Sequence, residues 1–429
     1  MPARQQRPRG RSTPLQTAAF NGSTSRVVAL LSSGSVPDID DCDVLGCSAL
    51  IYAASQGHTR IVEVLLDKGA DTSKATCDGF TALGMAAQDG HLAVVDMLVK
   101  AGADLKARTG QGCTVLHLCG ESGHAEAMAV LIEAGANPNS ATPDGTTPLY
   151  LAASRGRLDA VKVLLRAKAS PLLTATHPSG KTYVPLDTAA QYGHPEVVRE
   201  LIEQCGIKGC GGASSGLDAL HMAAQEQHLD IMAMLADAGV VDKGIALIGA
   251  AGYGREASIQ FLMQQPRLVS KAAYVNTRDG FGTTALICSI EACCSCSPRI
   301  VRILVNAGAD TTSPVRVTNT PGGLVVFNDS PVGYAARVVR EKRISGRDAT
   351  EEQLARLEAI HRLLLRVEAV HAVSWLWRFG ISSVGRTVEG SSRTKTASAQ
   401  LTSTLPMTRI RARRRGVILP VLFRYSSRP

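Results

Sequence analysis

Residues 81–104 read TALGMAAQDGHLAVVDMLVKAGAD and carry the signals that start and stop two helices. The Thr81 hydroxyl is suited to accept a hydrogen bond from an unpaired backbone N–H at the start of the first helix. Gly90 follows as a residue free to adopt positive φ, which ends that helix. The second segment has apolar residues at helical spacing on one face, namely Val94, Val95, Leu98 and Val99. We therefore predict two consecutive helices with a turn between them.

The first part of this stretch recurs along the chain. Its copies are TPLQTAAFNG from Thr13, SALIYAASQGH from Ser48, TALGMAAQDGH from Thr81, TVLHLCGESGH from Thr114, TPLYLAASRG from Thr147, VPLDTAAQYGH from Val184, DALHMAAQEQH from Asp218, IALIGAAGYG from Ile245 and TALICSIEAC from Thr284. Between Leu50 and Leu149 the leucine of this phrase returns in three successive steps of 33 residues. One short helix pair cannot bury its apolar face alone, so the series predicts a stack in which neighbouring pairs cover one another.

The 33-residue period and the TPLxxAA…GH phrase resemble the ankyrin repeat, which is a turn followed by two helices. The resemblance covers residues 13–340 and is strongest over 48–166. It implies an all-α solenoid of stacked helix-turn-helix units, with short β-turn or hairpin fingers between the units. Three dipeptides are typical of such fingers: Asp78-Gly79, Asp144-Gly145 and Asp279-Gly280.

The pattern divides the chain into four parts. We expect a disordered basic N-terminus over 1–12, nine to ten repeats over 13–342, a region built on a capping helix over 343–378, and a disordered basic tail over 379–429. The repeats become irregular after residue 205. The 27-residue step from Leu220 to Leu247 predicts a lost or shrunken hairpin, and the 39-residue step that follows predicts a long finger over about 264–283.

The expected capping helix begins after Thr350, which forms a capping-box pattern with Gln353. Apolar residues at helical spacing then predict a helix over about 351–374. We expect this helix to close the solenoid, because terminal units must shield the end of the core. Trp375 and Trp377 are expected to pack there.

Composition and charge narrow the classes of function. No run of 18 or more uncharged apolar residues is present, so we expect no membrane span. Residues 1–12 lack the apolar segment of a secretory signal, which favours an intracellular protein, cytoplasmic or nuclear. The eleven cysteines are then expected to be reduced thiols. The net charge of +9 comes from the two tails, because residues 13–377 alone carry −5. The body therefore lacks the overall basic surface of a nucleic-acid-binding domain.

Histidine recurs after glycine at one point of the repeat, as His58, His91, His124 and His194. Residues spaced one per unit cannot converge on a metal or a substrate. We interpret them as bonding turn backbone between the two helices. His117 and His221 stand at the TPLH position of the repeat and receive the same interpretation.

Four cysteines cluster in the sequence, at Cys288, Cys293, Cys294 and Cys296. A structural zinc site needs four ligands, and no second CxxC or nearby histidine completes the set. We interpret them as buried or partly exposed thiols, with Cys288 inside a first helix. Gly249–Gly254 (GAAGYG) is interpreted as a helix stop and not as a phosphate loop. Nucleophile, P-loop and HExxH motifs are missing, so we expect no enzyme activity, no cofactor and no metal.

The remaining hypothesis is a monomeric scaffold that binds another protein. In the resembled family, partners meet the concave face, which is formed by the hairpin tips and the exposed side of the first helices. Carried over by register, the partner-binding residues are Phe80, Gln88, Asp89, Gln111, Glu121, Asp144, Ser154, Arg155, Gln191, Tyr192 and Gln225. We prefer Tyr192, Arg155 and Phe80 as anchors, because large planar side chains dominate interface energetics.

An alternative function rests on the C-terminal basic cluster, which consists of Arg409, Arg411, Arg413, Arg414 and Arg415. Such a cluster could serve nuclear import, or bind RNA or an acidic lipid. The competing interpretation is a solvated basic tail without a role. No aromatic residue interleaves the arginines, which disfavours base stacking.

Overall fold

The structure is a computed structural model, which describes residues 12–33, 38–177, 180–210, 217–240, 244–264, 271–280, 282–291, 297–313, 316–317, 325–326, 330–345 and 350–378. The chain divides into a first unit, Met1–Val370, and a second unit, His371–Pro429. In the second unit the described residues are the last turns of one helix. The expected N-terminal and C-terminal tails, including the basic cluster, lie outside the described residues.

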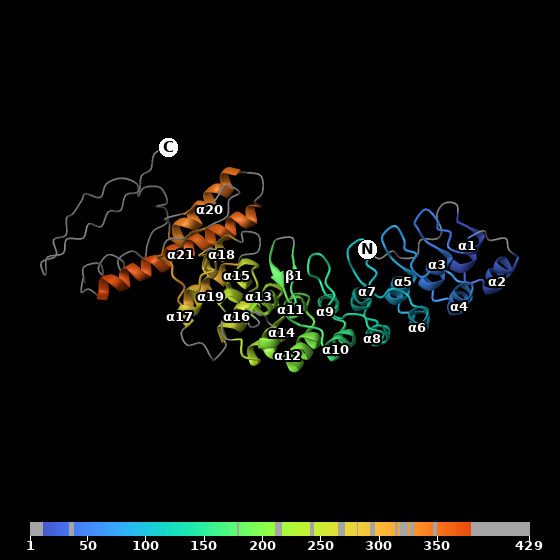
Figure 1. Cartoon of the computed structure of the whole chain (residues 1–429). Helices are drawn as coiled ribbons and strands as arrows, with labels where there is room; N and C mark the ends of the chain where they lie inside the picture. Colours follow the sequence, from blue (N-terminus) through green and yellow to red (C-terminus); the bar gives the residue numbers. More distant parts are fainter. Residues whose placement is uncertain are drawn as a thin grey trace. The chain divides into compact units, whose positions relative to one another are not determined.

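The first unit consists mainly of helix pairs that follow one another in chain order, from α1 to α19 (Figure 1). The first helices of the pairs are α1 (Pro14–Phe20), α3 (Ala49–Ser55), α5 (Ala82–Asp89), α7 (Val115–Ser122), α9 (Pro148–Ser154), α11 (Pro185–Gln191), α13 (Leu217–Glu226), α15 (Gly244–Gly252) and α18 (Ala285–Glu291). The second helices are α2 (Thr24–Ser32), α4 (Thr59–Asp67), α6 (Leu92–Lys100), α8 (Ala125–Glu133), α10 (Leu158–Arg166), α12 (Pro195–Cys210), α14 (Leu229–Asp237), α16 (Glu256–Gln264) and α19 (Pro298–Asn306).

The two helices of each pair belong to two separate rows. Each first helix packs against the first helices before and after it, as α5 does against α3 and α7. The second helices form the other row, in which α6 packs against α4 and α8. The predicted all-α stack of helix pairs is confirmed.

The core lies between the rows and is continuous along the stack. In the third repeat Leu83, Ala86 and Ala87 of α5 are fully buried, as are Val95 and Leu98 of α6. The alanines allow close approach of neighbouring first helices, while the larger residues fill the space between the rows. Truncating a fully buried leucine in such a core costs about 2–5 kcal/mol.

The helix ends follow the signals in the sequence. The Thr81 side chain accepts a hydrogen bond from the Gly84 N–H, and Thr147 does the same for Tyr150 N–H. Gly90 ends α5 with φ 78°, in the left-handed region. A Cβ atom there would also lie 2.4 Å from the His124 ring, so the position requires glycine for two reasons.

The hairpin fingers are bonded to one another as well as within themselves. Cys77 N–H donates to the Leu45 carbonyl at 2.9 Å, and Gly110 N–H donates to the Asp78 carbonyl at 2.7 Å. One finger forms a two-stranded antiparallel ladder, β1 (Ala175–Thr176) with β2 (Thr182–Tyr183). A second small ladder pairs β3 (Arg316–Val317) with β4 (Val325–Val326). Bonds between fingers fix the spacing of the repeats on this side of the stack.

The irregular region differs from expectation at one point. The segment 264–283, predicted as a finger, contains the short helix α17 (Lys271–Val275). Tyr274 and Val275 of this helix are buried, so packing against the stack has favoured helix over an extended finger. The shrunken hairpin is consistent with the structure, because α14 ends at Asp237 and α15 already begins at Gly244. In addition, α12 contains a break at Gly206, where φ is 68°.

The repeats are followed by two longer helices, α20 (Pro331–Ser345) and α21 (Glu351–Arg378). Thr350 and Gln353 form the expected capping box, with reciprocal side-chain bonds of 2.9 and 3.3 Å. Leu357, Ile360 and Leu364 of α21 are buried in the same core as the repeats. The side chains of Trp375 and Trp377 lie outside the described residues. Among the described helices, none is long and apolar enough to cross a membrane.

Candidate partner-binding surface

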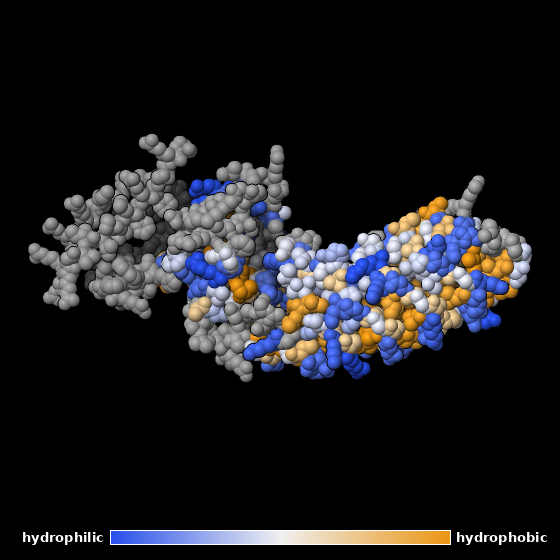
Figure 2. Space-filling view, in the orientation of Figure 1, coloured by the Kyte–Doolittle hydropathy of each residue, from blue (hydrophilic) through white to orange (hydrophobic). Residues whose placement is uncertain are grey.

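A row of side chains at the ends of the first helices follows the stack from repeat to repeat. We define this first-helix row as the two residues after the paired small residues of repeats two to seven: Ser55, Gln56, Gln88, Asp89, Glu121, Ser122, Ser154, Arg155, Gln191, Tyr192, Gln225 and Glu226. All are exposed or half-buried. On the face seen in Figure 2, polar residues alternate with apolar ones along the stack. Apart from Tyr192, the side chains of the row itself are polar or charged, so the row offers mainly hydrogen-bonding groups and one large aromatic ring.

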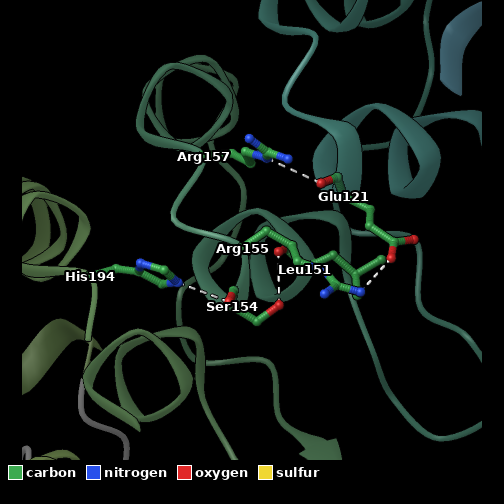
Figure 3. Close-up of polar contacts among 6 residues, drawn as sticks. All are labelled: Glu121, Leu151, Ser154, Arg155, Arg157 and His194. Carbon is green, nitrogen blue, oxygen red and sulfur yellow. Dashed lines mark hydrogen bonds and ion pairs between the residues drawn. The ribbon is translucent and has the colours of Figure 1, made fainter. Parts of the chain in front are cut away.

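Arg155 and Glu121 join two successive repeats across this row. The Arg155 Nη2 atom lies 2.6 Å from Glu121 Oε1, and both side chains remain about half exposed (Figure 3). An exposed pair of this kind stabilises the fold by about 0–1 kcal/mol. Its main consequence is to hold the guanidinium over the fourth repeat.

The recurrent histidines bond the stack together. His194 Nε2 lies 3.0 Å from the Ser154 carbonyl oxygen, which ends the first helix of the preceding repeat (Figure 3). His91 makes the equivalent bond to Ser55 at 3.1 Å. A carbonyl can only accept, so each Nε2 donates. For His58, His91 and His194 the predicted bond to backbone is present, but its acceptor belongs to the preceding repeat and not to the histidine's own turn.

Arginine replaces histidine at this position in two repeats. Arg157 Nε donates to the Glu121 carbonyl at 3.3 Å (Figure 3), and Arg255 Nε donates to the Gln225 carbonyl at 2.6 Å. We call the series the carbonyl ladder; its donors among the described residues include His58, His91, Arg157, His194, His228 and Arg255. The role of both arginines could have been predicted from the sequence, because each follows a glycine in the same register as the histidines.

The ladder fixes the backbone of residues predicted to contact a partner. The carbonyls of Glu121, Ser154, Gln191 and Gln225 each accept a bond from the following repeat. Their side chains therefore project from positions that two repeats hold together. Such restraint lowers the conformational entropy that a partner must overcome on binding.

Gln225 and Ser154, two further predicted contact residues of the first-helix row, also have side chains bonded within the chain. The Gln225 Nε2 atom lies 2.9 Å from Nε2 of His221, one helical turn away. The Ser154 hydroxyl donates to the Leu151 carbonyl at 2.9 Å (Figure 3). Neither engagement was visible in the repeat pattern. Both reduce what these side chains can offer to a partner.

The hairpin tips contribute the other predicted residues. Phe80 is half-buried, whereas Gln111 and Asp144 are exposed. Partial burial acts to raise the pKa of Asp144, but hydrogen bonds from the Thr142 and Thr146 hydroxyls outweigh it, and the net shift is downward. Asp144 therefore presents a carboxylate that is already part of its turn.

Among the described residues, the most exposed tyrosine, phenylalanine and tryptophan side chains lie at one register position. Tyr192, the residue after α11, is 60% exposed, and Tyr253 occupies the same position two repeats later with 53% exposed. Glu226 stands at that position in the repeat between them. Tyr253 was missed by the sequence reasoning because the eighth repeat is a weak copy; aligning GAAGYG with AAQYGH would have revealed it.

The cysteines and histidines of the sequence were the candidates for a metal site. Among the described residues, no group of three His, Cys, Asp or Glu side chains could hold a metal ion. Cys288 is half-buried in α18, as expected, while Cys293, Cys294 and Cys296 lie outside the described residues. Burial raises the pKa of Cys119 to about 12, which keeps this thiol protonated at neutral pH.

The TPLH histidines and the glycine run are also structural. Buried His117 accepts from Thr114 N–H through Nδ1 and lies 3.0 Å from the Thr146 carbonyl through Nε2. GAAGYG falls at the end of α15, where Gly254 has φ 69°. This position fits the predicted helix stop.

Comparison with known proteins agrees with the geometry. A family model described as ankyrin repeats (3 copies) matches residues 15–109, 85–175 and 171–245. A search of curated proteins gives no match.

Proposed function

Because the chain belongs to the ankyrin-repeat family, whose repeats are protein–protein interaction modules, we propose that it is a non-enzymatic scaffold or adaptor for another protein. The partner binds the first-helix row and the hairpin tips, the surface that corresponds to the family's concave face. Arg155 and Tyr192 are the central anchors, with Tyr253 as a further aromatic contact.

One observation carries this proposal. Arg155 and Tyr192 occupy the same register position in adjacent repeats, and both side chains are more than half exposed. The carbonyl ladder holds the backbone beside each of them. Arginine and tyrosine are the residue types most often found at binding hot spots. Rigid presentation of both makes this part of the row the best candidate for an interface centre.

The test is affinity purification of partners with the full chain and its variants. We expect Tyr192→Ala and Arg155→Ala each to reduce recovery of a discrete partner, with a loss of about 10-fold or more in affinity. Arg199→Ala is the matched control, because Arg199 is also about half exposed and pairs with Glu196 at 2.8 Å, but on a second helix. Recovery that is equal for all three variants would place the interface elsewhere.

A second proposal concerns the basic cluster Arg409–Arg415, five arginines with no acidic residue among them. Such a segment can serve as a nuclear import signal, or it can bind a nucleic acid and release the counterions of its phosphates. Deleting residues 405–416 is expected to abolish nuclear signal or salt-sensitive RNA binding. Unchanged localisation together with unchanged RNA binding would refute this function without affecting the scaffold proposal.

A further inference from the structure

The position three residues after the cap position of a repeat faces the next repeat along the stack. We call this the joint position; its polar residues include Gln16, His117, Asp187 and His221. Gln16 illustrates its role. Its Oε1 accepts from the Thr13 N–H at 2.8 Å, while its Nε2 donates to the Cys47 carbonyl in the next finger at 3.2 Å. One side chain thus closes its own helix and bonds the following repeat.

The two histidines act in a related way. His117 Nδ1 accepts from the Thr114 N–H, and its Nε2 donates to the Thr146 carbonyl of the next finger. His221 Nδ1 lies 3.0 Å from the Ile245 carbonyl of the next repeat. Burial lowers the pKa of both histidines, so the neutral rings carry these bonds. In each case the joint position supplies a hydrogen to the backbone of the following repeat.

Asp187 occupies the joint position between the sixth and seventh repeats. Its Oδ2 accepts from the Val184 N–H at 3.0 Å, which reproduces the capping half of the role. Its other oxygen, Oδ1, is buried without a hydrogen-bond partner, and the residue is only 4% exposed. A carboxylate has no hydrogen to donate forward, whereas a neutral carboxylic acid has one.

The groups around Asp187 also favour the neutral form. Burial, opposed by the hydrogen bond from the Val184 N–H and reinforced by the like charge of Asp218 on α13, raises its pKa to about 7. The other titratable neighbours are the phenols Tyr150 on α9 and Tyr183 on β2. Among the described residues, no cation contributes to the pKa of Asp187.

The remaining elements near Asp187 do not change this balance. The buried side chains of α12 are apolar, including Val197 and Leu201, and its Glu196 and Arg199 pair with each other on the exposed side. On α13, His221 interacts with Lys181 of the finger and with Asp218.

We propose that Asp187 is a proton-linked joint between the sixth and seventh repeats, bonding the next repeat as the neutral acid and releasing it as the carboxylate. By register, the acceptor is the backbone carbonyl of the residue before Asp218. Loss of the proton removes this bond and leaves a buried charge beside Asp218. This device is independent of which protein the first-helix row binds.

The direction of the pH effect follows from linkage. The pKa of Asp187 in the folded state lies above the ordinary value of 3.8. Asp187 therefore holds its proton more tightly when the sixth and seventh repeats are packed together than when they are separated. The joint is therefore most stable below about pH 4, and it weakens as the pH rises towards and through 7. Between about pH 5.5 and about pH 8 this shift raises the opening constant by about 30-fold.

The test is hydrogen exchange of the full chain, read by mass spectrometry, for the wild type and Asp187→Asn at about pH 5.5 and about pH 8. Asparagine keeps the cap acceptor and a forward donor at every pH. At the lower pH we expect the amides of α11 and α13 to exchange at the same rate in the wild type and in the variant. At the higher pH we expect these amides to exchange up to about 30-fold faster in the wild type than in the variant. Peptides of α3 and α5 should not differ.

The control is Asp310→Asn, because hydrogen bonds from Ser313 and Thr312 outweigh burial and lower the pKa of Asp310 to about 2. It stays ionised at both pH values, so its replacement should alter exchange equally at both. Asp187→His, which places the residue of His117 at this position, provides a second variant without a carboxyl group. It is also expected to abolish the loss of protection of α11 and α13 at the higher pH. For the wild type, the protection of α11 and α13 is compared with that of α3 and α5 at each pH. If this relative protection is the same at the two pH values, the proposal is refuted.

Discussion

Replacing His194 with alanine should weaken the stack between the fifth and sixth repeats. The change removes the Nε2–H donor that lies 3.0 Å from the Ser154 carbonyl and leaves that acceptor without its partner from the sixth repeat. The bond is partly buried, so the expected loss is about 1–2 kcal/mol, within the range for an unsatisfied buried acceptor. This corresponds to about a 5–30-fold rise in the local unfolding equilibrium.

The chain contains its own control for this experiment. Arg157 and Arg255 make the same bond from the same register position, so His194→Arg should restore most of the lost protection. The arginine can also occupy the space above a glycine, as Arg157 does above Gly123. Hydrogen exchange in α9 and α11, compared with α3, measures the effect locally and separates it from global unfolding.

Two results would refute the reasoning about His194. If alanine and arginine have equal effects, the side chain acts through the shape of its ring and not through the bond to the carbonyl. If alanine leaves exchange in α9 unchanged, the carbonyl ladder does not contribute to the coupling between repeats.

Three further predictions test the local signals and the electrostatics. Gly90→Ala should destabilise the third repeat by more than about 1 kcal/mol in urea unfolding, because φ is 78° and the new Cβ would lie 2.4 Å from the His124 ring. Thr81→Ala should cost about 1 kcal/mol through loss of the cap bond to Gly84 N–H, whereas Thr81→Ser should cost little in the same assay. Asp310→Asn should reduce the loss of stability on acidification: the folded pKa of about 2 lies below the ordinary 3.8, so this contribution is present above about pH 4 and is lost as the pH falls through about 2. Thermal unfolding of both proteins between about pH 2 and pH 6 measures it, and parallel curves would contradict the assignment.

The helix pairs could be predicted from sequence because their signals are local and repeated. Thr81, Gly90 and the buried Leu83 each act within one repeat, and the 33-residue step supplies the same evidence several times. The helix α17 could not be predicted in this way. It is five residues long, too short to show helical periodicity, and its formation depends on the burial of Tyr274 and Val275 against the stack.

For the candidate surface, the positions of the side chains could be predicted from the sequence, but their hydrogen bonds within the chain could not. Register alone placed Arg155 and Tyr192 at the ends of first helices, and both are exposed in the structure. The bond between Gln225 and His221 escaped prediction, because the orientation of His221 depends on the Ile245 carbonyl of the next repeat. A hydrogen bond across repeats is set by the stacking distance, which no single repeat encodes.

The carbonyl ladder connects the stability of the stack to its proposed binding surface. Except for His58, which bonds the Phe20 carbonyl of the first repeat, each donor holds the backbone of a first-helix row residue one repeat earlier, so His194 restrains Ser154 and His228 restrains Gln191. Arg155 and Tyr192 follow these two residues directly in the chain. A ladder variant should therefore weaken partner binding even though its side chain never contacts the partner, whereas a second-helix surface variant such as Arg199→Ala should not. The proposed interface is in this sense a property of consecutive repeats and not of single residues, because its anchors are positioned by donors that belong to the next unit.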